Sequence, residues 1–346
     1  MRWTSIGIYG GLLIAALIAS YLTWTHEPPG GKGDVVVFDT GAGGLQAVVY
    51  EEPDLRVQVE LREGGDDGVC WGTTRRVKDA PKKPPMPPRG DDDSAEAEES
   101  EPAEPERITE HKSFRGNETC DKVADRFAPM KALREFEEVT EEKLAEMELV
   151  ETEATLEVTS DKGGKTFDIG GRAYGSNDYY LREREAGTVY LVESRMIGDI
   201  KGGHNRLMER SLQAFKVEEI DRAVLQAETG AREFQQMNRD DRKAAFWADP
   251  ADTTRAADAA DAWIAKVIRL RATDYLEGDP EGLQTAVRVG FTDAGRDMGW
   301  IEVGTALGDD GETIYVARSG HSVAWVTVSE HTAADVVEGL AEVIES

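Results

Sequence analysis

Residues 155–200 read TLEVTSDKGGKTFDIGGRAYGSNDYYLREREAGTVYLVESRMIGDI, and this stretch decides the fold class. Apolar and polar residues alternate in short runs separated by turn residues, which is the pattern of antiparallel β-strands. The expected strands cover residues 155–159, 165–169, 179–182 and 189–193. A helix capped by Ser194 should follow the last strand. We therefore predict a β-meander that leads into a helix.

A similar pattern returns over 286–337, AVRVGFTDAGRDMGWIEVGTALGDDGETIYVARSGHSVAWVTVSEHTAADVV. Its expected strands cover residues 287–292, 299–304, 313–318 and 322–328. Thr332 and Asp335 make a capping-box-like start for a last helix. The sequence thus predicts an α+β fold of repeated antiparallel β-meander plus helix units behind one N-terminal transmembrane helix. The two copies lie near 155–207 and 286–344.

Further elements are expected around the two copies. Helical spacing is found over 117–127 and 133–147, and strands are expected near 220–226 and 233–237. A long helix carries Ala256, Ala260, Trp263, Val267 and Leu270 on one face. Asp252 or Thr253 is the expected cap of this helix. These elements complete a repeated α+β domain over residues 114–346.

The amino terminus predicts a membrane anchor. No charged residue lies between Arg2 and His26, and 22 apolar residues suffice to cross a bilayer as a helix. A cleaved signal peptide is the alternative, although small residues are poorly placed for cleavage. Arg2 and the free amine precede the span, whereas Lys32 is the only nearby cation after it, so the positive-inside rule places the amino end in the cytoplasm. We expect residues 1–25 to be a single-pass anchor in a bacterial cytoplasmic (inner) membrane, with the remainder extracytoplasmic.

Small residues repeat along one face of the expected anchor. Gly7, Gly11, Ala15 and Ala19 follow one another every four residues. Such a face allows a second membrane helix to approach closely, which makes it a candidate contact face. The alternative is that glycine and alanine are simply common in membrane spans.

Two further segments precede the repeated domain. Residues 34–76 alternate in short apolar runs between glycine-rich turns, which predicts a small β domain. Residues 78–110 combine prolines, a basic stretch and the acidic run DDDSAEAEESEPAEPE. A segment with so few apolar side chains cannot offset the entropy of ordering, so it is expected to be a disordered linker.

The two cysteines of the chain, Cys70 and Cys120, lie on either side of this linker. Outside the cytoplasm they can form a disulfide, which would attach the small β domain to the larger domain. The alternative is two unrelated thiols, because sequence alone does not give their distance.

Composition excludes some classes of function. The net charge is −28, and such a surface repels phosphate backbones, so no nucleic-acid partner is expected. Two cysteines and five scattered histidines leave little material for a metal site. We expect no metal and no cofactor.

Local motifs that suggest catalysis have simpler interpretations. Gly320-His321-Ser322 resembles a nucleophile elbow, but Ser322 should enter a strand, whereas an elbow leads into a helix. His321 and His331 are expected at the surface. Four paired carboxylates, Asp240, Asp241, Asp258 and Asp261, are expected on a turn and a solvated helix face. No catalytic residue is therefore predicted, and the chain is not expected to be an enzyme.

Three tyrosines near glycines, Tyr174, Tyr179 and Tyr180, could line a groove for a sugar or a peptide. Tyrosine in a strand more commonly packs against neighbouring strands, and we favour packing here.

Several motifs, in their order, resemble the family known as domain of unknown function 4340 (DUF4340). They are TLEVTSDKGGKTFDIGG, DYYLREREAGTVYLVESRMI, LMERSLQAFKVEEIDRAVL and W-x-x-P-x-D, and the resemblance covers about 117–346. It implies a repeated α+β unit, often behind one membrane helix. Some relatives accompany ABC-type transport or gliding-motility machinery of bacteria. The family supplies no agreed catalytic residues, and this chain lacks the extra membrane spans of the larger relatives.

These observations favour an interaction or scaffold protein that is integral to the membrane through one span. Its partners would be proteins of the cell envelope, within an ABC-type transport or motility complex. The alternative is a binding module for an envelope ligand such as a glycan or a peptide. An envelope hydrolase would require a buried cluster of titratable groups in a cleft.

Overall fold

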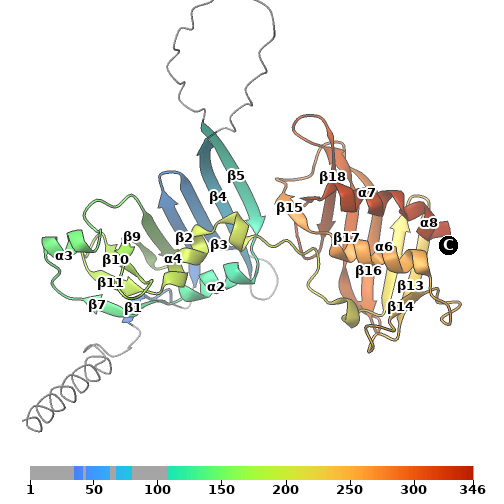
Figure 1. Ribbon diagram of the computed structural model, residues 1–346, viewed down its shortest axis with the longest axis horizontal. Helices are drawn as coiled ribbons and strands as arrows, with labels where there is room; N and C mark the ends of the chain where they lie inside the picture. The colour runs from blue at the N-terminus through green and yellow to red at the C-terminus, as the bar shows by residue number, and fades with distance from the viewer. Residues whose placement is uncertain (1–34, 42–43, 63–67, 80–106, 346) are drawn as a thin grey trace, which may run out of the picture.

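The computed structural model describes residues 35–41, 44–62, 68–79 and 107–345. These residues form two lobes, each made of one antiparallel sheet with helices packed against it (Figure 1). The predicted α+β class is therefore correct.

The first lobe is a nine-stranded sheet in the order β5-β4-β3-β2-β8-β9-β10-β11-β7. Its strands are β2 (Leu45–Glu52), β3 (Leu55–Arg62), β4 (Val69–Asp79), β5 (Arg107–Arg115), β7 (Arg134–Phe136), β8 (Thr155–Ser160), β9 (Gly163–Arg172), β10 (Tyr179–Glu183) and β11 (Val189–Val192). A separate pair consists of β1 (Val35–Phe38) and β6 (Met130–Ala132). The helices are α2 (Glu118–Arg126), α3 (Glu141–Glu146), α4 (Ser194–Lys201) and α5 (His204–Leu207).

The second lobe is an eight-stranded sheet in the order β14-β13-β12-β16-β17-β18-β19-β15. Its strands are β12 (Arg222–Ala227), β13 (Gly230–Met237), β14 (Phe246–Ala248), β15 (Ala272–Tyr275), β16 (Gln284–Asp293), β17 (Arg296–Leu307), β18 (Thr313–Ser319) and β19 (Val326–Val328). The helices are the 3-10 turn η1 (Val217–Glu219), α6 (Asp258–Arg269), α7 (Glu330–Glu338) and α8 (Leu340–Glu345).

The repeat is larger than the two meanders. From β4 to β7, each strand of the first sheet has a counterpart at the same place in the second sheet, from β14 to β15. The helices also correspond, because α2 and α6 precede β7 and β15, while α4 and α7 follow β11 and β19. Each unit therefore contains three strands, a helix, one strand, a four-strand meander and a final helical segment.

The strands predicted as a separate β domain over 34–76 belong to the sheet of the first repeat. Strand β2 pairs with β8, where Val48 faces Val158 and Tyr50 faces Leu156. All four side chains are buried. A short sheet on its own would leave an edge of unpaired backbone groups at β2, and the pairing with β8 satisfies them.

The meander strands of both copies form, with β19 shorter than predicted. It begins at Val326, since Val323 has a φ of 66° and the Ser322 Oγ donates to the carbonyl oxygen of Ala324 at 2.9 Å. These features close a turn where the sequence predicts an extended strand. Residues 134–136 are likewise not helical, because β7 pairs with β11.

Three predicted helix caps are wrong. Ser194 and Thr332 lie inside α4 and α7, whose caps are Glu193 and Ser329. The long helix begins after Ala257. The Asp252 carboxylate instead accepts hydrogen bonds from Thr254 and closes a local turn. Asp, Ser and Thr side chains also close local turns and lie inside helices, so a capping pattern in the sequence does not by itself fix where a helix begins.

The disulfide joins Cys70 on β4 to Cys120 on α2, with an S–S distance of 2.08 Å. Both residues are buried in the core. A Cβ added at Gly116 would collide with Cys120, so the close approach of helix and strand requires glycine at that position. The bridge therefore attaches α2 to the sheet that it covers.

The predicted anchor over 1–25, with Gly7, Gly11, Ala15 and Ala19, lies outside the described residues. Most of the linker predicted over 78–110 also lies outside them. Its two ends are strands, because Lys78 and Asp79 of β4 pair with Ile108 and Arg107 of β5. In the part of the chain that is described, no helix has the length and apolarity needed to cross a membrane.

Replacing both cysteines with serine (C70S/C120S) is expected to lower the free energy of unfolding by about 4 kcal/mol, since the bridge spans 50 residues. Urea unfolding followed by circular dichroism measures this change. Dithiothreitol should destabilise the wild type to the same extent and leave the double variant unchanged. A difference below about 1 kcal/mol would show that the bridge does not hold the lobe together.

Candidate functional site

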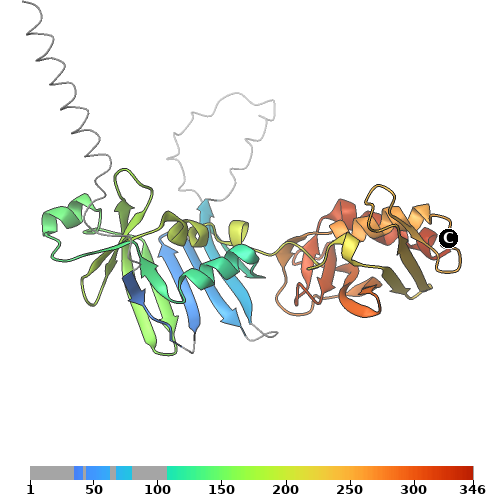
Figure 2. The ribbon, with the colours of Figure 1, turned by 90° about the horizontal axis from the view of Figure 1, so that it is seen from below.

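The two lobes meet at the edge strands of their sheets. Strand β5 ends the first sheet and β15 ends the second, and these two strands lie in contact (Figure 1). Figure 2 shows the lobes end to end, joined at a narrow waist. We call this contact the lobe junction and define it by six residues: Trp71, Lys112, Glu209, Asp274, Tyr275 and His321.

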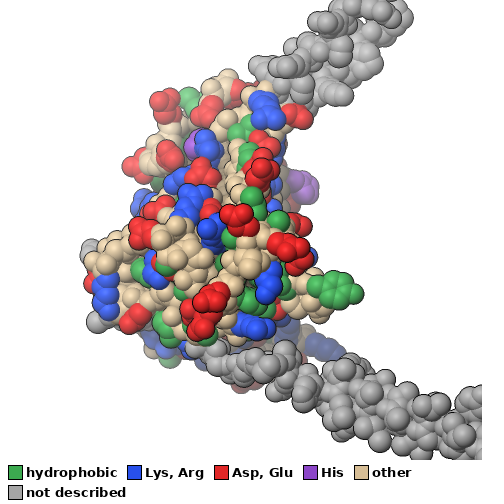
Figure 3. Space-filling view, turned by 90° about the vertical axis from the view of Figure 1, so that its left-hand side faces the viewer, with side chains coloured by type: hydrophobic (Ala, Val, Ile, Leu, Met, Phe, Trp, Pro, Cys, Tyr) green, Lys and Arg blue, Asp and Glu red, His purple; other side chains and the backbone are tan. Residues whose placement is uncertain are grey.

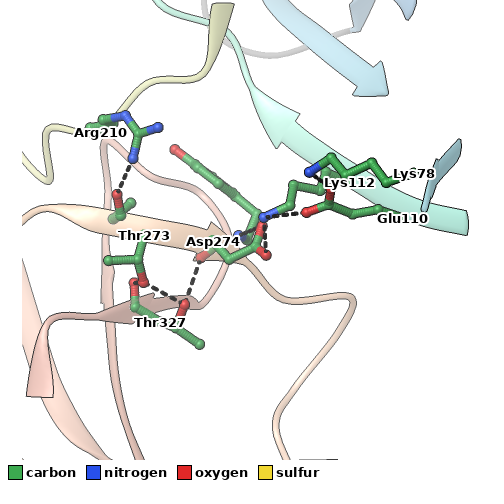
Figure 4. A network of polar contacts seen from close by, with 9 residues as sticks. Lys78, Glu110, Lys112, Arg210, Thr273, Asp274 and Thr327 are labelled. Carbon is green, nitrogen blue, oxygen red and sulfur yellow. Dashed lines mark hydrogen bonds and ion pairs between the residues drawn. The ribbon is translucent and has the colours of Figure 1, made fainter. Parts of the chain in front are cut away.

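An ion-pair network crosses the junction (Figure 4). The Lys112 Nζ lies 2.8 Å from Asp274 Oδ2 and 3.4 Å from Glu110 Oε1. Glu110 in turn pairs with Lys78, whose Nζ lies 2.6 Å from its Oε2. The Lys112 side chain is only 17% exposed, so its charge is poorly hydrated and depends on these two carboxylates.

The protonation equilibria at this network reflect its charges. Burial lowers the pKa of Lys112, but the contacts with Asp274 and Glu110 outweigh burial and raise it above the ordinary value. The hydrogen bond from Lys78 lowers the pKa of Glu110. Burial, helped by the charge of Lys112, lowers the pKa of His204, whose buried Nδ1 has no hydrogen-bond partner. The network is therefore charged near neutral pH, whereas His204 favours its neutral form.

Aromatic packing lies beside the ion pairs. The rings of Trp71 and Tyr275 meet edge to face, with centroids 6.1 Å apart. The Tyr275 Oη donates to the carbonyl oxygen of Glu209 at 3.0 Å, and Trp71 Nε1 donates to Ser113 Oγ at 2.8 Å. Burial of Tyr275 raises its pKa, so the hydroxyl remains a donor. The junction thus combines apolar contact with satisfied polar groups.

The segment between α5 and β12, residues 208–221, links the two lobes and is called the linker from here on. It makes backbone hydrogen bonds to both lobes. Glu209 N donates to the carbonyl oxygen of Arg115 at 2.9 Å, and Ala272 N donates to that of Arg210 at 2.9 Å. Thr273 is tied to Thr327 of β19 through their hydroxyl groups, 2.8 Å apart. The linker is therefore part of the packed structure at the junction.

His321 lies at the junction rather than on the free surface. Its Nε2 is 3.6 Å from Glu209 Oε2, and both side chains are 20% exposed. Burial raises the pKa of Glu209, but His321 and the backbone N–H groups of Ser211 and Arg210 outweigh burial and lower it. His331 is exposed, as the sequence predicts.

The other candidates for catalysis have structural roles. Ser322 is fully buried, and its Oγ accepts from Ser319 N within the turn before β19. No helix follows this turn directly, as an elbow would require. Asp261 accepts from Trp247 N at 3.1 Å, and Asp241 accepts from Lys243 N at 3.0 Å. Asp241 closes a local turn, whereas Asp261 connects α6 to β14, so the two carboxylates have separate structural roles.

The three tyrosines considered for a groove lie in different surroundings. Tyr174 is fully exposed on the loop between β9 and β10. The Tyr179 hydroxyl accepts from Arg172, while the ring of Tyr180 packs against Phe136 at 5.8 Å. Tyr180 therefore packs as predicted.

Within the described ranges, no group of three or more His, Cys, Asp or Glu side chains could hold a metal ion. The junction groups bind one another, so their arrangement suits holding two lobes together. Sequence reasoning missed Lys112, Glu209, Asp274 and Tyr275, because partners that lie 162 positions apart (Lys112 and Asp274) or 66 apart (Glu209 and Tyr275) give no local pattern.

A family model described as a domain of unknown function, DUF4340, matches residues 107–286, just over half of the chain. The chain belongs to the DUF4340 family. The match starts earlier and ends earlier than the resemblance over 117–346 that the motifs indicate. It includes β5, the linker and β15, so the DUF4340 region spans the lobe junction. Comparisons with curated proteins and with solved structures find no match.

Replacing Lys112 with methionine should lower the free energy of unfolding by about 1–2 kcal/mol, because Asp274 loses its partner at a half-buried site. Hydrogen exchange should become faster in β5 and β15. Lys78→Met is the matched control, since that side chain is 51% exposed, and about 0.5 kcal/mol or less is expected. Equal effects of the two substitutions would contradict the role given to Lys112.

Glu209 should make the junction sensitive to acid. Its pKa is lowered in the folded state, so its stabilising contribution is present above the ordinary value of about 4.3 and is lost as the pH falls through the folded value. Wild type should therefore exceed Glu209→Gln in stability near neutral pH, by about 1 kcal/mol, and the difference should shrink steadily as the pH falls below about 4.3.

Urea unfolding at several pH values measures this difference. Glu185→Gln, in an exposed turn between β10 and β11, is the control and should show no such dependence. A constant difference between wild type and Glu209→Gln across the acid range would rule out the proposed origin.

Proposed function

We propose that this chain is a membrane-anchored, extracytoplasmic interaction protein of a bacterial cytoplasmic membrane. The anchor is the apolar segment within residues 1–25. The observation that carries the proposal is the buried disulfide between Cys70 and Cys120. Disulfides form and persist in oxidising compartments, which lie outside the bacterial cytoplasm.

The lobe junction supports a role in presenting surfaces to partners. Ion pairs, an aromatic contact and backbone hydrogen bonds join the lobes at several points. These contacts keep the two lobes in a fixed orientation relative to each other, so partners would meet the same arrangement of surfaces each time. At the end of the first lobe, acidic and basic side chains are interspersed over the visible face, with small apolar patches among them (Figure 3). Such a surface suits recognition by charged protein partners in water.

The narrower form of the proposal is an accessory role in an ABC-type transport or motility complex. This role draws on the resemblance to DUF4340 relatives that accompany such machinery. The anchor would bring the lobes close to membrane-embedded partners and raise their effective concentration there.

The location can be tested in bacterial cells that express the full chain. Thiols are blocked by rapid acid quenching, and the chain is then labelled with a maleimide–polyethylene glycol with and without prior reduction. The protein should sediment with membranes, and a shift in mobility should appear only after reduction. Labelling of Cys70 and Cys120 without prior reduction, in a membrane-free cytosolic fraction with residues 1–25 still attached, would refute both the location and the anchor.

The interaction itself can be tested by co-purification in a mild non-ionic detergent over a range of salt concentrations. Envelope proteins should be recovered with the chain at low salt and lost at high salt, because the surface is strongly charged. Recovery of the chain alone at every salt concentration would contradict an interaction role.

A further inference from the structure

A pocket opens in the second lobe beside the segment that links the two lobes. Its volume is about 560 Å³, and it lies between the linker, β13, the loop before β14 and α6. This volume is within the range of pockets that bind small molecules. None of the six residues of the lobe junction lines it, so the pocket is separate from the contacts that join the lobes.

The rim of the pocket is rich in cations although the chain as a whole carries −28. Four cationic residues line it: Lys216, Arg242, Arg269 and Arg271. Two carboxylates also line it, and one of these, Glu218, lies 3.6 Å from Arg242 Nε. The second, Asp261, already accepts a hydrogen bond from Trp247 N. The local excess of positive charge favours an anion.

Among the described residues, three of these cations, Lys216, Arg269 and Arg271, have no carboxylate partner, and the Arg271 side chain donates only to backbone carbonyl groups. Neither Lys216 nor Arg269 forms an ion pair with any residue that the structure describes. Lys266, in the same last turn of α6 as Arg269, does pair with Asp335, at 2.9 Å. A cation in this turn of α6 can therefore find a carboxylate partner, as Lys266 does. Arg269 has none among the described residues.

Arg271 is held in place by the backbone. Its Nη1 donates to the carbonyl oxygens of Ile268 and Leu270, at 3.1 and 2.9 Å. The remaining N–H groups of the guanidinium are available to a ligand. A guanidinium fixed in this way suits carboxylate and phosphate groups, whose oxygens match its planar arrangement of donors.

The same pocket offers apolar contact. Phe215, Trp247 and Ile268 line it, and each is less than a tenth exposed. An inorganic anion would leave these side chains unused. A ligand that joins a negative group to an apolar body would use both parts of the pocket.

We propose that this pocket binds a small organic anion. Lys216, Arg269 and Arg271 hold its carboxylate or phosphate group, and Phe215, Trp247 and Ile268 pack against its apolar part. The site does not depend on the anchoring or the partner role proposed above.

Isothermal titration of the full chain in non-ionic detergent tests the proposal. The probes are benzoate, phenyl phosphate, neutral benzamide and inorganic phosphate, at matched low ionic strength. At least one of the two aromatic anions should bind about tenfold more tightly than benzamide. Phenyl phosphate should also bind more tightly than inorganic phosphate, and the preferred aromatic anion identifies the head group.

The variant K216Q/R269Q should weaken binding of the preferred anion by about tenfold. Lys243→Gln is the matched control, because this exposed lysine lies next to Arg242 without lining the pocket, and binding should be unchanged. Both variants change surface side chains, and their thermal unfolding without ligand checks that they fold. Trp247 supplies a second readout, since the preferred aromatic anion should alter tryptophan fluorescence in the wild type and not in Trp247→Phe.

Four results would overturn the proposal. The first is that neither aromatic anion binds at millimolar concentration. The second and third are that benzamide binds as tightly as the preferred aromatic anion, or that inorganic phosphate binds as tightly as phenyl phosphate. The fourth is that K216Q/R269Q binds the preferred anion with unchanged affinity.

Discussion

The pairing of β2 with β8, and of β12 with β16, is the interaction on which each lobe depends. In both cases it joins a sheet of three or four strands to a four-strand meander, with buried side chains facing one another across the pair. Without it each half would expose an edge of unpaired backbone groups and lose part of the common core. In each lobe the helices pack against one face of the joined sheet. Neither the first group of strands nor the meander is wide enough to form that face alone.

The contact between the two lobes is of a different kind. Edge strands β5 and β15 meet through side chains, while the linker supplies the backbone hydrogen bonds on either side. Buried core residues nevertheless run continuously from one lobe into the other. The junction therefore holds the lobes firmly, although its ion pairs depend on protonation state, and this combination favours a protein that presents fixed surfaces.

The distribution of charge separates two kinds of surface. Acidic excess is spread over the chain, whereas the pocket beside the linker gathers unpaired cations above an apolar floor. A uniformly acidic coat would serve solubility alone. Cations gathered at one concave site repel one another, and a bound anion would relieve that repulsion, which is why we associate the pocket with a ligand.

The sequence by itself determined the α+β class, the meander strands over 155–193 and the helix within 117–127, since period-two alternation and helical spacing are set by residues a few positions apart. Its resemblance to DUF4340 was also correct. Only the tertiary structure decided that residues 45–79 complete the first repeat, and that Lys112 meets Asp274. Pairings of this kind join residues about a hundred or more positions apart, and the free energy that selects them comes from a shared core and satisfied edges, neither of which leaves a pattern along the chain.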